Sequence, residues 1–434
     1  MDIWKVRGGR KLEGACFVQG SKNASLPIIA ASLICPSETE LMNVPQLRDV
    51  DSALRILRYL GCGAEQKGND LYINSVGISE NKIPHSLMLE MRSSVIFMGA
   101  LLARCGEARL SLPGGCQLGK RPIDIHISAL RQMGAEIEED GRNIYCTAPK
   151  LHGCKIHLPF PSVGATENIM LAASAADGET VITGAAKEPE ITALADYMRS
   201  LGCKIMGDGT DCIVIDGMKP IMQISHRIIS DRIVASTIAC ATAATGGDVE
   251  LRAVEPEHFS TVLHFLKKAG CDIICDKYTV RLRSDGKLKA VGDVCTQPYP
   301  GFPTDAQPVL MAALLKAEGR TVITENIFEN RYRQAEQLCK LGADISVKDR
   351  VAVVKGVDKL CGAGLEASDL RGGAAMIVAG MQSEGLTEIY DDGHIKRGYE
   401  DFDKVFSSLG ADIELSDMKG ASDGFQYTYE KTQN

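Results

Sequence analysis

Apolar positions follow one pattern that recurs six times along the chain. In each copy an apolar residue precedes a glycine, a small residue follows it, and an apolar segment begins. The residue four positions before each glycine is also apolar. Apolar residues at these two positions are typical of the last turn of an amphipathic helix that ends at the glycine. The glycines, 68 to 73 residues apart, are Gly61, Gly134, Gly202, Gly270, Gly342 and Gly410.

The segment after each glycine is predicted to be a β-strand, and five of the six copies carry Ile three positions after the glycine. Cys62, Cys203 and Cys271 stand in the small position that the other copies fill with alanine. We therefore interpret these three cysteines as packing residues rather than as ligands.

A second helix is predicted earlier in each copy, and it is apolar almost all round. Bodies such as NASLPIIAASLI and RGGAAMIVAGM have no polar face, so they are expected to be buried on all sides. The predicted starts are Lys22, Arg92, Gly164, Arg232, Asp305 and Arg371.

Six units, each with a buried helix, an outer helix and several strands, predict an α/β fold of two domains with three repeated units each. Helices inside and sheets outside would make each domain an inside-out α/β barrel. We predict that residues 22–229 form the first domain. Residues 1–21 and 230–434 would form the second, with a poorly ordered polar tail after Met418.

Five of the six predicted buried helices begin at a charged residue, and four of these residues are cations. A cation at a helix N-terminus opposes the helix dipole, whereas a bound anion there gains from the dipole and from free N–H groups. The cations either form ion pairs between units or converge on an anionic ligand, and we favour the ligand. Asp305 is the one carboxylate in the series, which makes it the natural general base.

Three further arginines support a shared site. Arg48, Arg121 and Arg397 each lie 13 residues before their repeat glycine. They come from both predicted domains, so the sequence predicts a site in the cleft between the domains.

The stretch LPGGCQLGKRPIDIH at 112–126 carries a lone cysteine between glycines and cations. Gly114 and Gly115 favour an exposed, mobile loop. Lys120 and Arg121 would stabilise a thiolate at Cys116 and could hold an anion. The alternative is a surface turn with an incidental cysteine.

Composition narrows the class of protein. The chain has 434 residues and a formal charge of -8, which argues against a general nucleic-acid or membrane-surface binder. The start lacks the apolar segment of a signal peptide, and the longest apolar runs are too short to span a bilayer. We expect a cytoplasmic protein whose 15 cysteines are reduced. Cys271 and Cys275 give only a weak indication of metal binding.

Ten stretches match the motifs of one known family. They are GSKNASLP at 20–27, MRSS at 91–94, LPGGCQLGKRPIDIH at 112–126, PSVGAT at 161–166, EPEI at 188–191, SDRI at 230–233, FPTDAQ at 302–307, IFENR at 327–331, SDLR at 368–371 and HIKRGYE at 394–400. On these stretches the chain resembles the enolpyruvyl transferases, and among them the branch that uses UDP-N-acetylglucosamine. The resemblance implies two inside-out α/β domains with the active site in the cleft between them.

The resemblance further implies that the enolpyruvyl group of phosphoenolpyruvate passes to the 3-hydroxyl of UDP-N-acetylglucosamine, with release of phosphate, in peptidoglycan synthesis. Lys22 and Asn23 would contact phosphoenolpyruvate, and Arg121 and Arg397 would hold its phosphate and carboxylate. These two small molecules are the expected partners, without nucleic acid or membrane. No metal or redox cofactor is expected, and a monomer is compatible with the reaction.

The same resemblance assigns the proton transfers and the sugar-nucleotide site. Cys116 would protonate the methylene carbon and could form a covalent adduct, and Asp305 would take the proton of the sugar hydroxyl. Addition of a hydroxyl to the double bond of an enol phosphate needs such an acid and such a base. The residues that would bind UDP-N-acetylglucosamine are Arg92, Arg121, Pro122, Ile123, Asp124, Ile125, Val163, Gly164, Asp305 and Ile327.

The chain departs from the usual family residues at Phe160, Val234, Ser236 and Gln334. Two alternatives stay open beside the main interpretation. One is the sister enzyme that acts on shikimate 3-phosphate, whose match to the cysteine loop would be poor. The other is a weakly catalytic paralog that binds a UDP-sugar and regulates wall synthesis, for which loss of a catalytic residue would be the expected signature.

Overall fold

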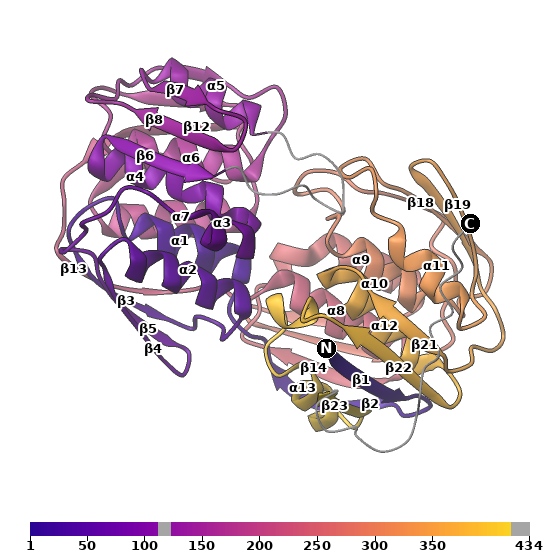
Figure 1. Cartoon of the computed structure of the whole chain (residues 1–434). Helices are drawn as coiled ribbons and strands as arrows, with labels where there is room; N and C mark the ends of the chain where they lie inside the picture. Colours follow the sequence, from indigo (N-terminus) through magenta and orange to yellow (C-terminus); the bar gives the residue numbers. More distant parts are fainter. Residues whose placement is uncertain (112–122, 418–434) are drawn as a thin grey trace, which may run out of the picture.

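The computed structural model of the chain describes residues 1–111 and 123–417, except for the side chain of Arg92. Its helices and strands form two halves, each with its own hydrophobic core (Figure 1). The first core is built from residues 24–228. The second combines residues 4–18 with residues 234–413.

The predicted outer helices are confirmed. All six repeat glycines have a positive φ, between 93° and 110°, a backbone conformation that glycine adopts without strain. Each follows a helix with one face on the core. These helices are α2 (Arg48–Tyr59), α5 (Asp124–Gln132), α7 (Pro189–Ser200), α9 (Ser260–Lys268), α11 (Arg333–Cys339) and α13 (Phe402–Ser408).

The described residues form six separate sheets, three on each core. Those of the first half are β13 (Gln223–Arg227), β3 (Glu38–Met42), β5 (Asp70–Asn74) and β4 (Gly63–Lys67); β6 (Glu107–Ser111), β8 (Asn143–Thr147) and β7 (Glu136–Glu139); and β11 (Cys203–Met206), β12 (Cys212–Met218), β10 (Thr180–Thr183) and β9 (Lys155–His157), each in spatial order.

The second half repeats this arrangement. Its sheets are β15 (Asp272–Asp276), β16 (Thr279–Ser284), β14 (Gly247–Arg252) and β2 (Leu12–Phe17); β17 (Asp293–Cys295), β18 (Arg320–Thr324), β20 (Val351–Lys355) and β19 (Asp344–Lys348); and β21 (Gly364–Ala367), β22 (Leu386–Asp391), β1 (Asp2–Arg7) and β23 (Asp412–Asp417).

All the sheets share one plan. In each four-stranded sheet one edge strand runs parallel to its neighbour and the other pairs are antiparallel. In the three-stranded sheet a single parallel bridge between Lys82 and Arg109 stands where the others have the parallel edge strand. The α/β class is therefore confirmed. Each sheet is open among the described residues, so the structure shows no closed barrel.

The apolar helices lie inside the halves, as predicted, but four of their predicted starts need correction. These helices are α1 (Lys22–Ala31), α4 (Phe97–Cys105), α6 (Val163–Ala173), α8 (Arg232–Thr245), α10 (Gln307–Ala313) and α12 (Leu370–Gln382). Gly164 is the second residue of its helix, α6. Arg92 begins a 3-10 segment, η1 (Arg92–Ile96), that leads into α4. Asp305 lies in a turn before α10, because Pro308 fits the first turn of a helix, where its missing N–H costs nothing. Arg371 is the second residue of α12, behind the cap Asp369.

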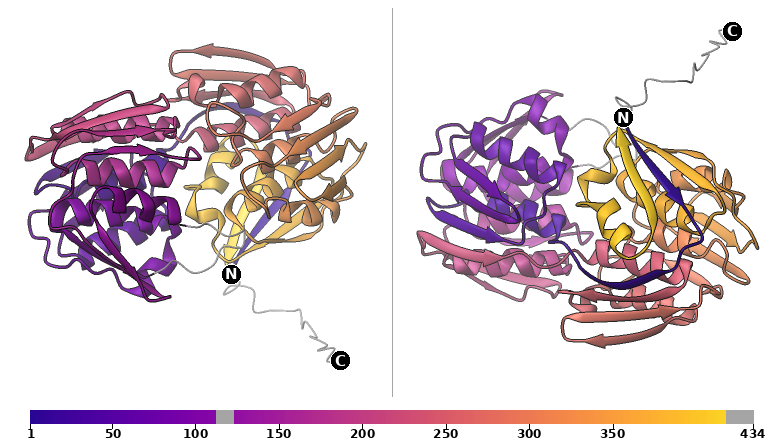
Figure 2. Two further views of the ribbon diagram at one scale, coloured as in Figure 1. Left: turned by 90° about the horizontal axis from the view of Figure 1, so that it is seen from above. Right: turned by 90° about the horizontal axis from the view of Figure 1, so that it is seen from below.

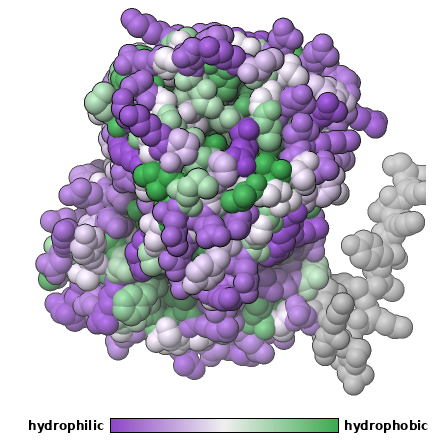
Figure 3. All heavy atoms as spheres, turned by 90° about the vertical axis from the view of Figure 1, so that its left-hand side faces the viewer, coloured by the Kyte–Doolittle hydropathy of each residue, from purple (hydrophilic) through white to green (hydrophobic). Residues whose placement is uncertain are grey.

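Three shorter helical segments complete the fold: α3 (His85–Glu90), η2 (Pro256–Phe259) and η3 (Ile395–Arg397). No helix within residues 1–111 and 123–417 combines the length and the apolar character needed to cross a membrane. The outer faces of the sheets carry polar residues at alternate positions, and the face of the first half in Figure 3 is accordingly mostly polar with scattered apolar residues.

The chain passes between the halves twice, and the two connections pair with each other. Gly20 and Ser230 form an antiparallel bridge, in which Ser21 N donates to Ile229 O over 2.7 Å. A side chain at position 20 would overlap the carbonyl of Asn43, so this crossing requires glycine. The N-terminal strands, indigo in Figure 2, run along the second half.

Candidate active site

Two cations from different halves share one buried carboxylate. Lys22, the first residue of α1, donates from Nζ to Asp49 Oδ2 over 3.3 Å. Arg397, the last residue of η3, donates from Nε to Asp49 Oδ1 over 2.8 Å and from Nη2 to Oδ2 over 3.3 Å. Asp49 is 2% exposed, so this ion pair is shielded from water. The structure thus brings together two of the predicted phosphoenolpyruvate ligands.

Burial and charge act in opposite directions on this cluster. Burial lowers the pKa of Lys22, and Asp49 raises it while Arg371 and Arg397 lower it further. Burial alone would raise the pKa of Asp49, but Lys22 and Arg397 outweigh that effect and lower it. Asp49 is therefore held ionised between its two cations.

The predicted base, Asp305, is bound by two arginines that are themselves almost fully buried. Arg331 Nη2 donates to Asp305 Oδ1 over 2.9 Å, and Arg371 donates from Nη2 and Nε to Oδ2 over 3.2 and 3.3 Å. The carboxylate keeps 31% of its surface exposed, whereas the arginines are 2% and 3% exposed. Asp305 is thus fixed in place and accessible.

Thr304, next to Asp305, could cap the following helix by its residue type, but it does not. The cap position of α10 is Ala306, without a side-chain hydrogen bond. Thr304 Oγ1 donates instead to Glu325 Oε2 over 3.0 Å. Glu325 also accepts the backbone N–H groups of Ile327 and Phe328 over 2.8 and 3.0 Å. One buried carboxylate thereby joins the turn of Asp305 to the turn of Ile327, two residues predicted to meet the sugar nucleotide.

A second ion pair crosses between the halves. Arg232, at the start of α8, donates from Nε to Glu190 Oε1 of α7 over 3.0 Å, and both residues are buried. The Tyr299 ring lies 5.6 Å from the guanidinium. Burial and the carboxylates of Glu190 and Glu188 raise the pKa of Glu167 well above its ordinary value.

These contacts bear on the two interpretations of the cations at helix starts. Lys22, Arg232 and Arg371 are each held by a carboxylate of the chain itself. In this structure, therefore, these three cations form ion pairs within the protein. Binding of an anionic ligand to the same cations stays a prediction.

The predicted nucleotide residues gather where two helices begin side by side. Ile123 caps α5, Asp124 and Ile125 form its first turn, and Val163 and Gly164 begin α6. A Cβ at Gly164 would lie 3.1 Å from the His126 ring, so glycine permits the close approach. Two adjacent helix N-termini are suited to an anionic diphosphate.

The neutral side chain of His126 links α5 to α6 through Asn168. Asn168 donates from Nδ2 to its Nδ1 over 2.8 Å, while Asn168 Oδ1 accepts Gly99 N over 2.7 Å. Burial lowers the pKa of His126 to about 4, against a smaller opposite effect of Asp124. An uncharged imidazole can accept the amide hydrogen, so the local network is consistent.

Several predicted residues cannot be placed. Cys116, Arg121 and Pro122 lie outside the described residues, as does the Arg92 side chain. Asn23 follows Lys22 in the first turn of α1. Phe160 is exposed, whereas Val234, Ser236 and Gln334 are buried. Within the described ranges no cluster of three or more metal-ligating side chains occurs.

The packing role of the small-position cysteines is confirmed. All three are buried, and burial raises the pKa of Cys62 and Cys271 to about 11 and that of Cys203 to about 12. They are therefore poor nucleophiles near neutral pH.

Four residues of the charged networks around the candidate site were not predicted from the sequence. They are Asp49, Glu190, Glu325 and Arg331. Asp49 follows the singled-out Arg48, and Arg331 ends the IFENR motif, so their neighbours carried a signal. Their partners are far apart in sequence, and only the fold brings them together.

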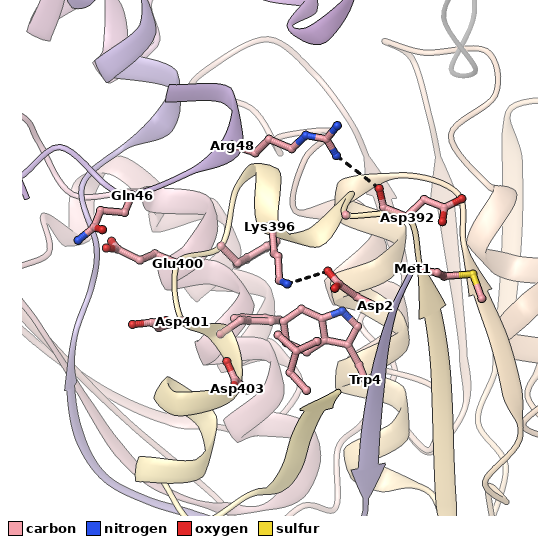
Figure 4. A pocket seen from close by; sticks show the side chains of 14 residues that line it. Met1, Asp2, Trp4, Gln46, Arg48, Asp392, Lys396, Glu400, Asp401 and Asp403 are labelled. Carbon is pink, nitrogen blue, oxygen red and sulfur yellow. Dashed lines mark hydrogen bonds and ion pairs between the residues drawn. The ribbon is translucent and has the colours of Figure 1, made fainter. Parts of the chain in front are cut away.

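A pocket of about 590 Å³ has Arg48 and Lys396 in its lining (Figure 4). Arg48 reaches it from the first half and donates to Asp392 O over 3.5 Å, and Lys396 pairs with Asp2 over 2.9 Å. Its lining includes these chain neighbours of Asp49 and Arg397, but not Lys22, Asp305 or Arg397. The pocket is thus distinct from the cation cluster.

Comparison with known proteins identifies the family of the chain. The family model described as EPSP synthase (3-phosphoshikimate 1-carboxyvinyltransferase) matches residues 6–406. Two relatives are UDP-N-acetylglucosamine 1-carboxyvinyltransferase 2 of Caldanaerobacter subterraneus subsp. tengcongensis, 46% identical, and UDP-N-acetylglucosamine 1-carboxyvinyltransferase of Geotalea daltonii, 44% identical. Each alignment covers 95% of this chain and 99% of the relative.

Solved structures show the same fold. The enolpyruvyl transferase NikO from Streptomyces tendae is 24% identical with a TM-score of 0.86, over 96% of this chain and 99% of its own. EPSP synthase from Acinetobacter baumannii is 23% identical with a TM-score of 0.74, over 96% and 100%. With the family model matching nearly the whole chain and curated relatives above 40% identity, the chain belongs to the EPSP synthase family of enolpyruvyl transferases.

Proposed function

We propose that the protein transfers the enolpyruvyl group of phosphoenolpyruvate to the 3-hydroxyl of UDP-N-acetylglucosamine and releases phosphate, as a cytoplasmic step of peptidoglycan precursor synthesis. The observation that carries the proposal is the full-length identity of 42% to 46% with relatives of that name. The site geometry supports it, because Lys22 and Arg397 converge on one point and Asp305 lies close enough to Lys22 to influence its charge.

The architecture suits a reaction between two bound molecules. We propose that residues 22–229 form one domain and that residues 1–21 and 230–434 form the other, with the sheets of each set around its buried helices in an inside-out arrangement. The site residues come from both halves, so substrates would bind between them. The paired α5 and α6 N-termini would hold the diphosphate, and Ile327 and Arg92 would line the sugar-nucleotide site.

Each predicted residue has a chemical task in this reaction. Lys22, Arg121 and Arg397 would neutralise phosphoenolpyruvate. Cys116 would give a proton to its methylene carbon while Asp305 takes the proton of the sugar hydroxyl, whose oxygen bonds to the central carbon. Loss of a methyl proton and of phosphate from that adduct then restores the double bond on the sugar.

The direct test measures phosphate release from phosphoenolpyruvate with each candidate acceptor. We expect turnover with UDP-N-acetylglucosamine and a product whose mass increases by one enolpyruvyl group. Turnover only with shikimate 3-phosphate would replace the proposal with the sister activity. Binding of the UDP-sugar without turnover would favour the regulatory paralog.

Cys116 is expected to be the thiol most readily alkylated by an epoxide phosphonate shaped like phosphoenolpyruvate, such as fosfomycin. Its neighbours Lys120 and Arg121 favour the thiolate, whereas burial raises the pKa of thiols such as Cys16, to about 11. Peptide mapping by mass spectrometry, with and without UDP-N-acetylglucosamine, measures the site and rate of labelling.

Labelling is expected to be faster with the sugar nucleotide present. Cys116→Asp is the matched control, because it keeps a proton donor and removes the nucleophile, so it is expected to retain turnover without an adduct. A main adduct on an exposed thiol such as Cys361 would contradict the assignment.

A further inference from the structure

We propose that Asp49 is a positioning residue for phosphoenolpyruvate, a buried carboxylate that keeps the Lys22 ammonium charged and aims Arg397 at the substrate from the opposite half. The inference rests on the proposed function, since it takes Lys22 and Arg397 as ligands of phosphoenolpyruvate. It adds a residue that itself does not touch the substrate.

The contacts leave both cations able to bind a substrate. Arg397 uses Nε and Nη2 for Asp49, so its Nη1 edge is not engaged in this pair. An ammonium has three donors, and Lys22 gives one of them to Asp49. Asp49 accepts some of the hydrogen-bond donors of each cation and orients the other donors for the substrate, as a supporting residue does.

Asp49 is rigidly held where it can act in this way. It is the second residue of α2, where the positive end of the helix dipole stabilises a carboxylate. The α2 helix packs against α1, which carries Lys22, and against η3, which carries Arg397. The carboxylate therefore binds one cation from each half at the point where the substrate anion is expected.

Lys22 needs this counter-charge because its surroundings oppose a positive charge. Burial disfavours the ammonium, and so do Arg397 of η3 and Arg371 of α12. Of the carboxylates, Asp305 favours it more weakly than Asp49 does. Asp231, the cap of α8, accepts the backbone N–H of Lys22 over 3.2 Å. Asp49 is thus the main group that keeps Lys22 protonated when substrate arrives.

The first test compares Asp49→Asn with wild type in steady-state kinetics. Removal of an opposite charge at this distance shifts a titration by about one pH unit or more. We expect kcat/KM for phosphoenolpyruvate to fall about tenfold or more, with KM for UDP-N-acetylglucosamine within about threefold. The alkaline limb of the kcat/KM profile should move to lower pH, because Lys22 then loses its proton earlier.

The second test does not depend on turnover. The rate of Lys22 acetylation by acetic anhydride is followed against pH by peptide mass spectrometry, which gives the titration of that amine. In Asp49→Asn this titration should move to lower pH, and in Asp49→Glu, which restores the charge, it should return toward wild type.

The matched control is Asp248→Asn. Asp248 also binds two cations, Arg281 and Arg283, over 2.7 to 2.8 Å, but it lies in β14 away from the cluster. It should leave the kinetics and the Lys22 titration unchanged. An Asp49→Asn protein with the wild-type Lys22 titration, or with kcat/KM for phosphoenolpyruvate within about twofold of wild type, would overturn the proposal. If the wild-type protein shows no turnover, the proposed function is rejected. The Lys22 titration would still test the role of Asp49 in that case.

Discussion

Asp305→Asn is expected to lower turnover about 10²-fold or more, because an amide cannot take the proton of the sugar hydroxyl. The structure strengthens this expectation in two respects. Asp305 does not cap α10, so loss of a helix cap cannot explain the effect. Its carboxylate is also partly exposed while Arg331 and Arg371 hold it in one orientation. The measurement is kcat at saturating concentrations of both substrates.

The alternative is that Asp305 only neutralises its two arginines. Thermal unfolding and the dissociation constant of UDP-N-acetylglucosamine test this, and both are expected to stay close to wild type. Glu325→Gln is the matched control, since it loosens the same turn without touching the proposed base. An equal loss of turnover in that variant would assign the effect to the turn. Activity of Asp305→Asn within about threefold of wild type would remove Asp305 from the mechanism.

The second large effect is expected at the buried ion pair that joins α7 to α8. Glu190→Gln keeps the volume of the side chain but leaves Arg232 charged without its main partner. Breaking a buried pair in this way costs about 3–5 kcal/mol of the free energy of unfolding. Glu188 and the ring of Tyr299 lie near enough to recover part of that loss. Urea-induced unfolding, followed by intrinsic fluorescence and circular dichroism, measures the change.

Two further variants distinguish the loss of the buried Glu190–Arg232 pair from a general effect of removing a charge. Asp248→Asn breaks a partly exposed pair, for which the cost is expected to be about 1 kcal/mol or less. Glu190→Leu combined with Arg232→Met replaces the buried charges with apolar side chains and should recover most of the stability. A loss below 1 kcal/mol in Glu190→Gln would show that solvent or Glu188 already screens Arg232.

The repeat could be predicted from sequence because it depends on local rules. Glycine at Gly61 and its equivalents marks both the helix end and the positive φ, and the apolar spacing before it marks the buried face. The start of α10 was predicted less well, since an acid in a turn and an acid at a helix start look alike in sequence. Pro308 was the better signal for where that helix begins.

The site was predictable where a family motif carries it and not where the fold assembles it. Lys22, Asp305 and Arg397 stand in motifs, and the structure places each of them in a charged cluster. Asp49 meets Arg397 across 348 positions of sequence, and Arg232 meets Glu190 across 42. No local pattern encodes such a pair, because it arises only when two halves pack against each other.

The pairing of the first two strands with the second half has a consequence for folding during synthesis. The strands β1 and β2 leave the ribosome well before their partners β22, β23 and β14, which all follow the first half in sequence. Residues 24–228 can close their own core during translation, while β1 and β2 wait as unpaired strands. Synthesis of β22 and β23 is then the step that completes the second half, and until then β1 and β2 are the segments that a chaperone would need to shield.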